Sequence, residues 1–136
     1  MPRLLELFAG TGSVGQAFKR QGWEVVSLDI SPKYNPTHVA DLHSWDSHIY
    51  ERDYFDFVWG SPVCTQYSIA RTTGAPRDLL SADRLVKRML EIMSRFRCHC
   101  AFENPQSGLL PRRSVVAGLP FSSCAAGNGR RSLLLM

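Results

Sequence analysis

Short apolar runs alternate with amphipathic stretches along this chain. Apolar runs at residues 4–8, 24–28, 38–42, 54–59 and 99–103 predict five strands. Helical spacing of apolar residues predicts helices over residues 14–20 and 82–96, with weak helical character at 45–52. Strands that alternate with helices are typical of an α/β fold, in which helices cover both faces of a parallel sheet. The pattern therefore predicts a Rossmann-like parallel sheet of about five strands.

The helix over residues 82–96 has the clearest pattern in the chain, and Ser81 is its expected N-cap. Its apolar face predicts packing against the sheet. The opposite face carries mostly charged residues: Arg84, Lys87, Arg88, Glu91 and Arg95. We interpret this face as a solvated surface, with a DNA-binding surface as the alternative.

Three glycines, Gly10, Gly12 and Gly15, stand between the first strand and the first helix. Glycine tolerates positive φ and lets the backbone approach a ligand closely, and a helix start offers unpaired N–H groups. Asp29 ends the second strand roughly 20 residues later, where an acidic residue binds ribose hydroxyls in such folds. The pattern predicts a nucleotide-type ligand here; a tight turn without a ligand is the alternative.

Polar side chains gather where the remaining predicted strands end. In a parallel α/β sheet the carboxyl ends of the strands form the ligand-binding edge. Asp41, the turn at residues 60–64 and the turn at residues 103–105 would join Asp29 there. Cys64 suits a nucleophile and Glu103 a general acid. The alternatives are a small buried residue for Cys64 and a turn-capping carboxylate for Glu103.

Composition narrows the class of protein. The 136 residues predict one domain, 44% of them are hydrophobic, and the net charge of +4 suits a polyanionic partner. The four cysteines lack the paired spacing of a zinc site, so no metal is expected. Neither a membrane-spanning run nor a signal peptide is recognisable. We expect an intracellular protein, in the cytoplasm or nucleus or in a virus-infected host cytoplasm, and not a secreted one.

Three segments in this order resemble the motifs of DNA (cytosine-5)-methyltransferases. They are Leu7-Phe8-Ala9-Gly10-Thr11-Gly12, Gly60-Ser61-Pro62-Val63-Cys64-Thr65-Gln66-Tyr67-Ser68 and Glu103-Asn104-Pro105. Each follows the strand that the family pattern requires, and the resemblance covers roughly residues 3–110. It implies S-adenosylmethionine as cofactor and DNA as substrate.

The resemblance also implies roles for single residues. Cys64 would add to C6 of a cytosine flipped out of the duplex, Glu103 would interact at the ring N3, and Asn104 would help to hold the nucleophile loop. Asp29 would bind the ribose and Asp41 the adenine amino group. The full set of implied cofactor-binding residues is Phe8, Gly10, Thr11, Gly12, Asp29, Ile30, Asp41 and Pro62.

The chain departs from this family in several places. Pro62-Val63-Cys64 replaces Pro-Pro-Cys, Thr65 replaces Gln, and Pro105 replaces Val. No Gln-x-Arg-x-Arg segment or target-recognition region follows. We expect a catalytic domain over residues 1–121, an incomplete methyltransferase fold, and an irregular, poorly ordered tail over residues 122–136. Such a chain is expected to bind the cofactor weakly and to fall short of full methylation turnover on DNA alone.

Three other functions fit parts of the sequence. An amino-methyltransferase acting on adenine N6 or cytosine N4 would use Ser61-Pro62, but the aromatic residue that stacks the base is missing. The second is a non-catalytic fragment, which would bind either S-adenosylmethionine or a partner methyltransferase. The abrupt change of composition in the tail favours this function. A nicotinamide-dependent dehydrogenase fits the glycines but gives Cys64 and Glu103 no role.

Overall fold

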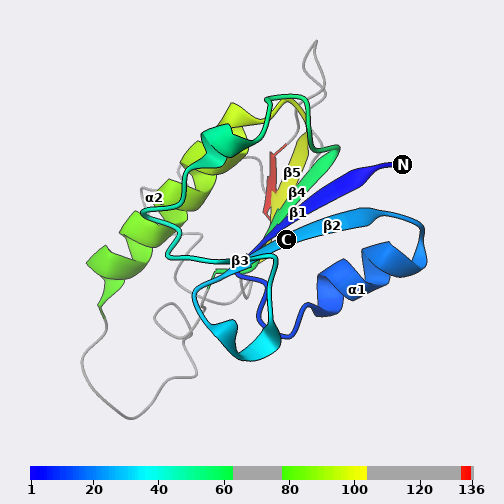
Figure 1. Ribbon diagram of the computed structural model, residues 1–136. Coiled ribbons are helices and arrows are strands. Elements are labelled where there is room, and N and C mark those ends of the chain that lie inside the picture. Colours follow the sequence, from blue (N-terminus) through cyan, green and yellow to red (C-terminus); the bar gives the residue numbers. More distant parts are fainter. Residues whose placement is uncertain (63–77, 104–132, 136) are drawn as a thin grey trace.

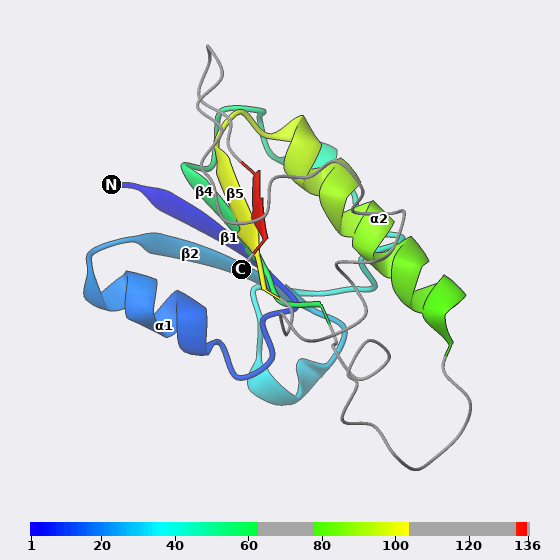
Figure 2. The same cartoon turned by 180° about the vertical axis from the view of Figure 1, so that it is seen from behind.

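The computed structural model describes residues 1–62, 78–103 and 133–135. Six parallel strands form one sheet in the order β3-β2-β1-β4-β5-β6 (Figure 1). The strands are β1 (Arg3–Leu7), β2 (Glu24–Asp29), β3 (His38–Val39), β4 (Phe57–Gly60), β5 (His99–Phe102) and β6 (Leu133–Leu135). Helix α1 (Ser13–Arg20) lies on one face of the sheet and α2 (Leu79–Arg95) on the other (Figures 1 and 2). The predicted α/β fold is confirmed.

Strand β1 is the centre of the described sheet. It pairs with β2 on one side and with β4 on the other, so that Leu7 stands opposite both Leu28 and Gly60. The four residues after Arg3 in this strand are all buried. A strand covered on both faces needs this near-continuous apolar sequence rather than alternation of polar and apolar residues.

Helix α1 packs against β1 and β2. Gly15 makes this close approach possible: a Cβ there would meet the Glu6 carboxyl group and lie 2.9 Å from Cγ1 of Val25. Phe18 extends the contact, because its ring lies edge-on to Trp23 at 4.9 Å between centroids and 5.9 Å from that of Phe57. The absence of a side chain at residue 15 therefore sets how closely the helix approaches the sheet.

Helix α2 covers the opposite face and buries the larger part of the core. Its N-cap is Asp78, whose carboxylate accepts a hydrogen bond from the Ser81 amide at 3.0 Å. The prediction of Ser81 as the N-cap is therefore wrong, because the helix begins three residues earlier than the apolar periodicity indicates. The main apolar cluster includes Val86, Met89, Ile92 and Met93 of α2 and Leu5, Leu7, Val58, Cys100 and Phe102 of the sheet.

Several element boundaries differ from the predictions. The third strand stops at Val39 because a hydrogen-bonded turn begins at Asp41. The fourth begins at Phe57, since Tyr54 and Phe55 pack in an aromatic cluster instead. Residues 45–52 contain only the short 3₁₀ helix Ser47–Ile49, and another, Pro32–Tyr34, lies in the connector after β2.

In segment 122–136, predicted to be irregular, the three residues that the structure describes form a strand. Residues Leu133–Leu135 form β6, which pairs in parallel with β5. An apolar run of this length is too short to show a period, so its sequence alone does not predict a strand. The remainder of that tail lies outside the described residues, and the proposed domain boundary at residue 121 stays a prediction.

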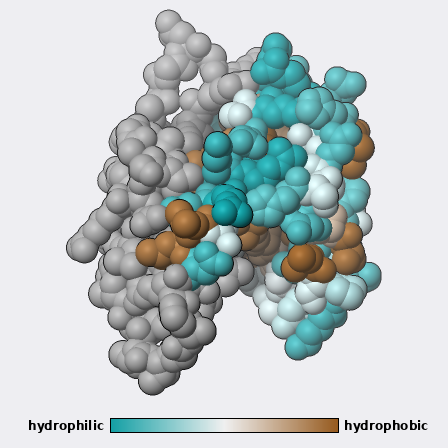
Figure 3. Space-filling view, turned by 90° about the vertical axis from the view of Figure 1, so that its left-hand side faces the viewer, coloured by the Kyte–Doolittle hydropathy of each residue, from teal (hydrophilic) through white to brown (hydrophobic). Residues whose placement is uncertain are grey.

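On the side shown in Figure 3, the described surface is mostly polar, with small separate apolar patches. Among the described residues, the exposed large apolar side chains are spread along the sequence: Met1, Ile30, Tyr34, Val39, Ile49 and Leu80. None of the described helices is long and apolar enough to cross a membrane.

Candidate functional site

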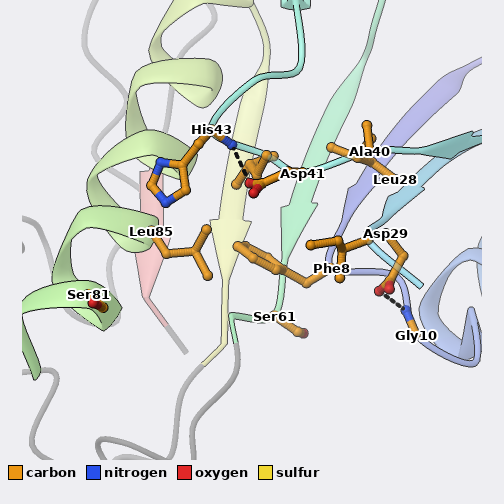
Figure 4. Close-up of a pocket in the computed structure, with 12 residues that line it drawn as sticks. Phe8, Gly10, Leu28, Asp29, Ala40, Asp41, His43, Ser61, Ser81 and Leu85 are labelled. Atoms are coloured by element: carbon orange, nitrogen blue, oxygen red, sulfur yellow. Dashed lines mark hydrogen bonds between the residues drawn. The ribbon is translucent and has the colours of Figure 1, made fainter. Parts of the chain in front are cut away.

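A cavity of about 500 Å³ opens at the carboxyl ends of the strands (Figure 4). This volume is within the range of pockets that bind small ligands. One wall comes from the ends of β1, β2 and β4, a second from the turn after β3, and a third from the first turns of α2. The lining residues are Phe8, Gly10, Leu28, Asp29, Ile30, Ala40, Asp41, Leu42, His43, Ser61, Ser81 and Leu85.

Backbone hydrogen bonds continue beyond the strands and join their ends into one edge. The amide of Ala40 donates to Asp29 O and that of Ala9 to Leu28 O, each at 3.0 Å. On the other side of β1, the Ser61 amide donates to Leu7 O at 3.4 Å. Glu103 follows, with its amide 2.9 Å from Gly60 O. The residues after five neighbouring strands are therefore held side by side.

The turn after β1 has three residues in the left-handed region. Phe8 has φ +56°, Gly10 +51° and Gly12 +74°, and Gly12 is the N-cap of α1. This conformation is unfavourable for a bulky side chain such as phenylalanine and is concentrated at functional sites. The Phe8 ring projects into the cavity toward Leu85 of α2 (Figure 4). The strained backbone thus places an aromatic face in the cavity.

Asp29 links the end of β2 to the glycine turn. Its Oδ2 accepts a hydrogen bond from the Gly10 amide at 2.8 Å, and its Oδ1 accepts one from the Ser31 amide at 2.8 Å. Each carboxylate oxygen has two lone pairs, so both can also accept from ligand hydroxyl groups. Asp29 can therefore hold the turn and bind a ligand at the same time.

Asp41 and His43 occupy the wall formed by the turn after β3. Oδ1 of Asp41 accepts a hydrogen bond from the His43 amide at 2.9 Å, which fixes the start of the turn (Figure 4). Both residues are exposed and both line the cavity. The two carboxylates, Asp29 and Asp41, make this cavity suitable for hydroxyl and amino donors rather than for anions.

The β4 end places a hydroxyl group at the cavity. Nε1 of Trp59 donates a 3.0 Å hydrogen bond to Oγ of Ser61, which fixes the Ser61 side chain. Pro62, the last described residue before the predicted nucleophile loop, is buried. Glu103 is exposed beside this strand end, and its role as a general acid stays a prediction.

The structure brings together five of the predicted cofactor residues: Phe8, Gly10, Asp29, Ile30 and Asp41 all line the cavity. Thr11, Gly12 and Pro62 belong to the same turns but are not among its lining residues. Cys64 and Asn104 lie outside the described residues. Their positions relative to Glu103 stay a prediction.

Seven lining residues were not predicted: Leu28, Ala40, Leu42, His43, Ser61, Ser81 and Leu85. Apolar or small side chains at strand ends look like ordinary core residues in the sequence. Leu85 fitted the apolar face of its helix, and only the packing of α2 against the sheet places it at a cavity. His43 could have been noticed as a polar neighbour of Asp41.

Glu6 is a buried carboxyl group beneath the glycine turn, with 3% of its surface exposed. Its Oε2 accepts a 3.1 Å hydrogen bond from the Gly15 amide. Burial raises the pKa of Glu6, while the bond from Gly15 and the charge of Lys19 oppose that rise. This role could not be predicted from the sequence, because a single acidic residue in an apolar strand has no characteristic spacing.

Among the residues that the structure describes, no group of three or more His, Cys, Asp or Glu side chains could hold a metal ion. Cys98 and Cys100 are both buried, so they belong to the core rather than to a surface site.

Comparison with known proteins gives one informative relative. The chain is 38% identical over 81 residues to a protein of Frog virus 3 (isolate Goorha) named as a probable DNA (cytosine-5)-methyltransferase. The chain is homologous to this viral protein. The match covers 55% of the chain and 35% of the relative, so the chain spans about a third of that protein. The resemblance inferred from the three motifs is thereby confirmed, although no protein-family model matches the chain.

Proposed function

We propose that this chain carries the cofactor site and nucleophile of a DNA (cytosine-5)-methyltransferase. The observation that carries the proposal is the hydrogen-bonded edge described above. It puts the glycine turn, two acidic cavity residues and Glu103 along one edge of the sheet, next to the point where the chain continues toward Cys64. The homology to a protein with that name supports the same function.

The described cavity suits S-adenosylmethionine in size and chemistry. Asp29 would accept hydrogen bonds from the ribose hydroxyls and Asp41 from the adenine amino group. Phe8, Ile30 and Leu85 offer apolar surface to a flat ring, and Gly10 lets the backbone approach the methionine part. When bound, this cofactor supplies an electrophilic methyl group.

The chain's own residues would prepare the cytosine. The Cys64 thiolate would form a bond to C6, which makes C5 electron-rich. Glu103, at the end of β5, would interact at N3 and stabilise the charge that develops on the ring. After methylation, loss of the C5 proton and breakage of the sulfur–carbon bond would restore the free thiolate.

A covalent-trapping experiment tests the proposal. Duplex DNA containing 5-fluorocytosine, incubated with the chain and S-adenosylmethionine, should give a denaturation-resistant complex, because fluorine at C5 prevents the final elimination. Cys64→Ser should abolish the complex. Cys98→Ala is the matched control, since Cys98 is buried in the core, and it should retain the complex.

Two other outcomes identify the alternatives. Cofactor binding in titration calorimetry without any trapped complex would indicate a non-catalytic S-adenosylmethionine-binding protein. Ser61-Pro62 follows β4, where amino-methyltransferases carry their motif. Methyl groups found on adenine N6 or cytosine N4 after DNA hydrolysis, with no dependence on Cys64, would support that enzyme class instead.

A further inference from the structure

Arg88 was predicted to lie on the solvated face of α2, but its side chain is only 26% exposed. The prediction for this residue is therefore wrong. Its guanidinium donates from Nε to Leu42 O at 3.1 Å and from Nη2 to Trp45 O at 2.8 Å. Nη1 lies 3.5 Å from Oε2 of Glu91, a longer and more exposed contact. Arg88 therefore joins α2 to the turn after β3.

That turn carries the acidic wall of the cavity. Asp41 O accepts hydrogen bonds from the amides of Ser44 at 3.1 Å and Trp45 at 3.0 Å, which closes the turn. The Trp45 side chain is buried in the core and anchors its far end. Asp41, Leu42 and His43 then face the cavity. The two carbonyls bound by Arg88 flank His43, so the guanidinium holds the segment that presents the cavity residues.

Arg88 also continues a row of residues along α2. Ser81 and Leu85 line the cavity, and Arg88 follows at the next helical position on the same side, because residues three and four apart share a face. Helix α2 thus contributes both residues that line the cavity and the arginine that holds the turn after β3. A planar guanidinium can donate to two carbonyls in a fixed geometry, which a lysine ammonium cannot reproduce.

We propose that Arg88 is a positioning residue, which holds the Asp41 turn against α2 so that the Asp41 carboxylate selects a ligand with an amino group on its purine ring. The inference rests on the proposed function, in which the cavity binds the adenosyl group. A mispositioned Asp41 weakens binding mainly of ligands that carry the amino group, because only these donate a hydrogen bond to it.

The test compares S-adenosylhomocysteine with S-inosylhomocysteine, in which an oxo group replaces the purine amino group. Dissociation constants are measured by titration calorimetry on the full chain. The unmodified chain should prefer the adenosyl ligand by about tenfold or more, which is the effect of one good hydrogen bond. Arg88→Met should reduce this preference to about twofold by weakening the adenosyl ligand, and Arg88→Lys should give an intermediate value.

Glu91→Gln is the matched control, because it removes the ion-pair partner of Arg88 without touching the turn; it should leave the preference unchanged. Amide hydrogen exchange gives a second readout without ligand. The amides of Ser44 and Trp45 should exchange at least about tenfold faster in Arg88→Met. If Arg88→Met does not fold, Arg88→Lys is compared with the unmodified chain in both measurements.

Equal weakening of both ligands, with the preference intact, would show that Arg88 is only structural and would overturn the inference. Unchanged exchange at Ser44 and Trp45 would overturn it as well. Failure of the unmodified chain to bind either ligand would count against the proposed cofactor site itself. Binding of both ligands with equal affinity would overturn the selective role while leaving cofactor binding in place.

Discussion

The Gly10 amide donates a 2.8 Å hydrogen bond to Oδ2 of Asp29, which ties the turn after β1 to the end of β2. The same carboxylate accepts from the Ser31 amide through Oδ1. One side chain thereby orders two loops that both border the cavity. The geometry of the glycine turn depends on an acid located nineteen residues further along the chain.

Replacing Asp29 with asparagine tests this link. The asparagine NH₂ group would face one of the two amide donors, so one hydrogen bond is lost and a part-buried N–H is left unsatisfied. We expect a loss of about 1–3 kcal/mol in the free energy of unfolding. Affinity for S-adenosylhomocysteine should fall by about ten- to a hundredfold.

Asp56→Asn is the matched control for this variant. Oδ2 of Asp56 accepts a 2.8 Å bond from the Arg3 amide at the opposite end of β1, away from the cavity. Denaturant unfolding and titration calorimetry should show unchanged ligand affinity in this control. Equal affinity losses in both variants would contradict a local role for Asp29.

Glu6→Gln should change how stability depends on pH. Because burial raises the pKa of Glu6 in the folded chain, the unfolded chain releases this proton at lower pH than the folded one. The contribution of Glu6 is complete below its unfolded pKa of about 4.3 and is lost as pH rises through the higher folded value. The glutamine oxygen can still accept from the Gly15 amide.

The measurement is the free energy of unfolding of both proteins between about pH 4 and pH 8. The stability of Glu6→Gln relative to the unmodified chain should increase as pH rises through this window. A constant difference across the range would contradict a raised pKa for Glu6.

Gly15→Ala should destabilise the chain although alanine favours helices. The helix propensity gain is about 1 kcal/mol, whereas the new Cβ would meet the Glu6 carboxyl group and Cγ1 of Val25 at 2.9 Å. Overpacking of this kind costs about 1–3 kcal/mol, so we expect a net loss. Denaturant unfolding measures it.

Ala17→Gly in the same helix serves for comparison, since Ala17 is exposed. It should cost only about 1 kcal/mol through propensity. Stabilisation by Gly15→Ala would mean that α1 can move away from the sheet without loss.

Trp59→Phe should loosen Ser61 at the cavity. The substitution keeps an aromatic ring in β4 but removes the 3.0 Å hydrogen bond from Nε1 to Oγ of Ser61. Loss of one such bond predicts about a three- to tenfold weaker affinity for S-adenosylhomocysteine. Trp23→Phe, beyond the C-terminal end of α1, should leave this affinity unchanged when both are measured by calorimetry.

The sequence predicted the parallel α/β fold because buried strands and an amphipathic helix have strong local patterns. It did not predict where β4 begins, since Tyr54 and Phe55 have the composition of a strand but pack with Tyr50 and Phe96. Tertiary packing, rather than local propensity, decided that boundary.

The candidate site was predictable where a motif marks it, as for Gly10 and Asp29. Arg88 was not, because its helical position indicates solvent and only the distant Leu42 and Trp45 carbonyls cover it. The same holds for Ser81 and Leu85, which reach the cavity only through the packing of α2. Contacts between residues some forty positions apart leave no local trace in a single sequence.

The central position of β1 also bears on how the chain is made. During synthesis Arg3–Leu7 emerges before both strands that pair with it, and one of them, Phe57–Gly60, is roughly fifty residues further along the chain. Closing so long a loop is entropically costly and slows folding. In the growing chain the four consecutive buried residues after Arg3 therefore stay uncovered on one side until β4 has been synthesised, and apolar strands exposed in this way are prone to aggregate.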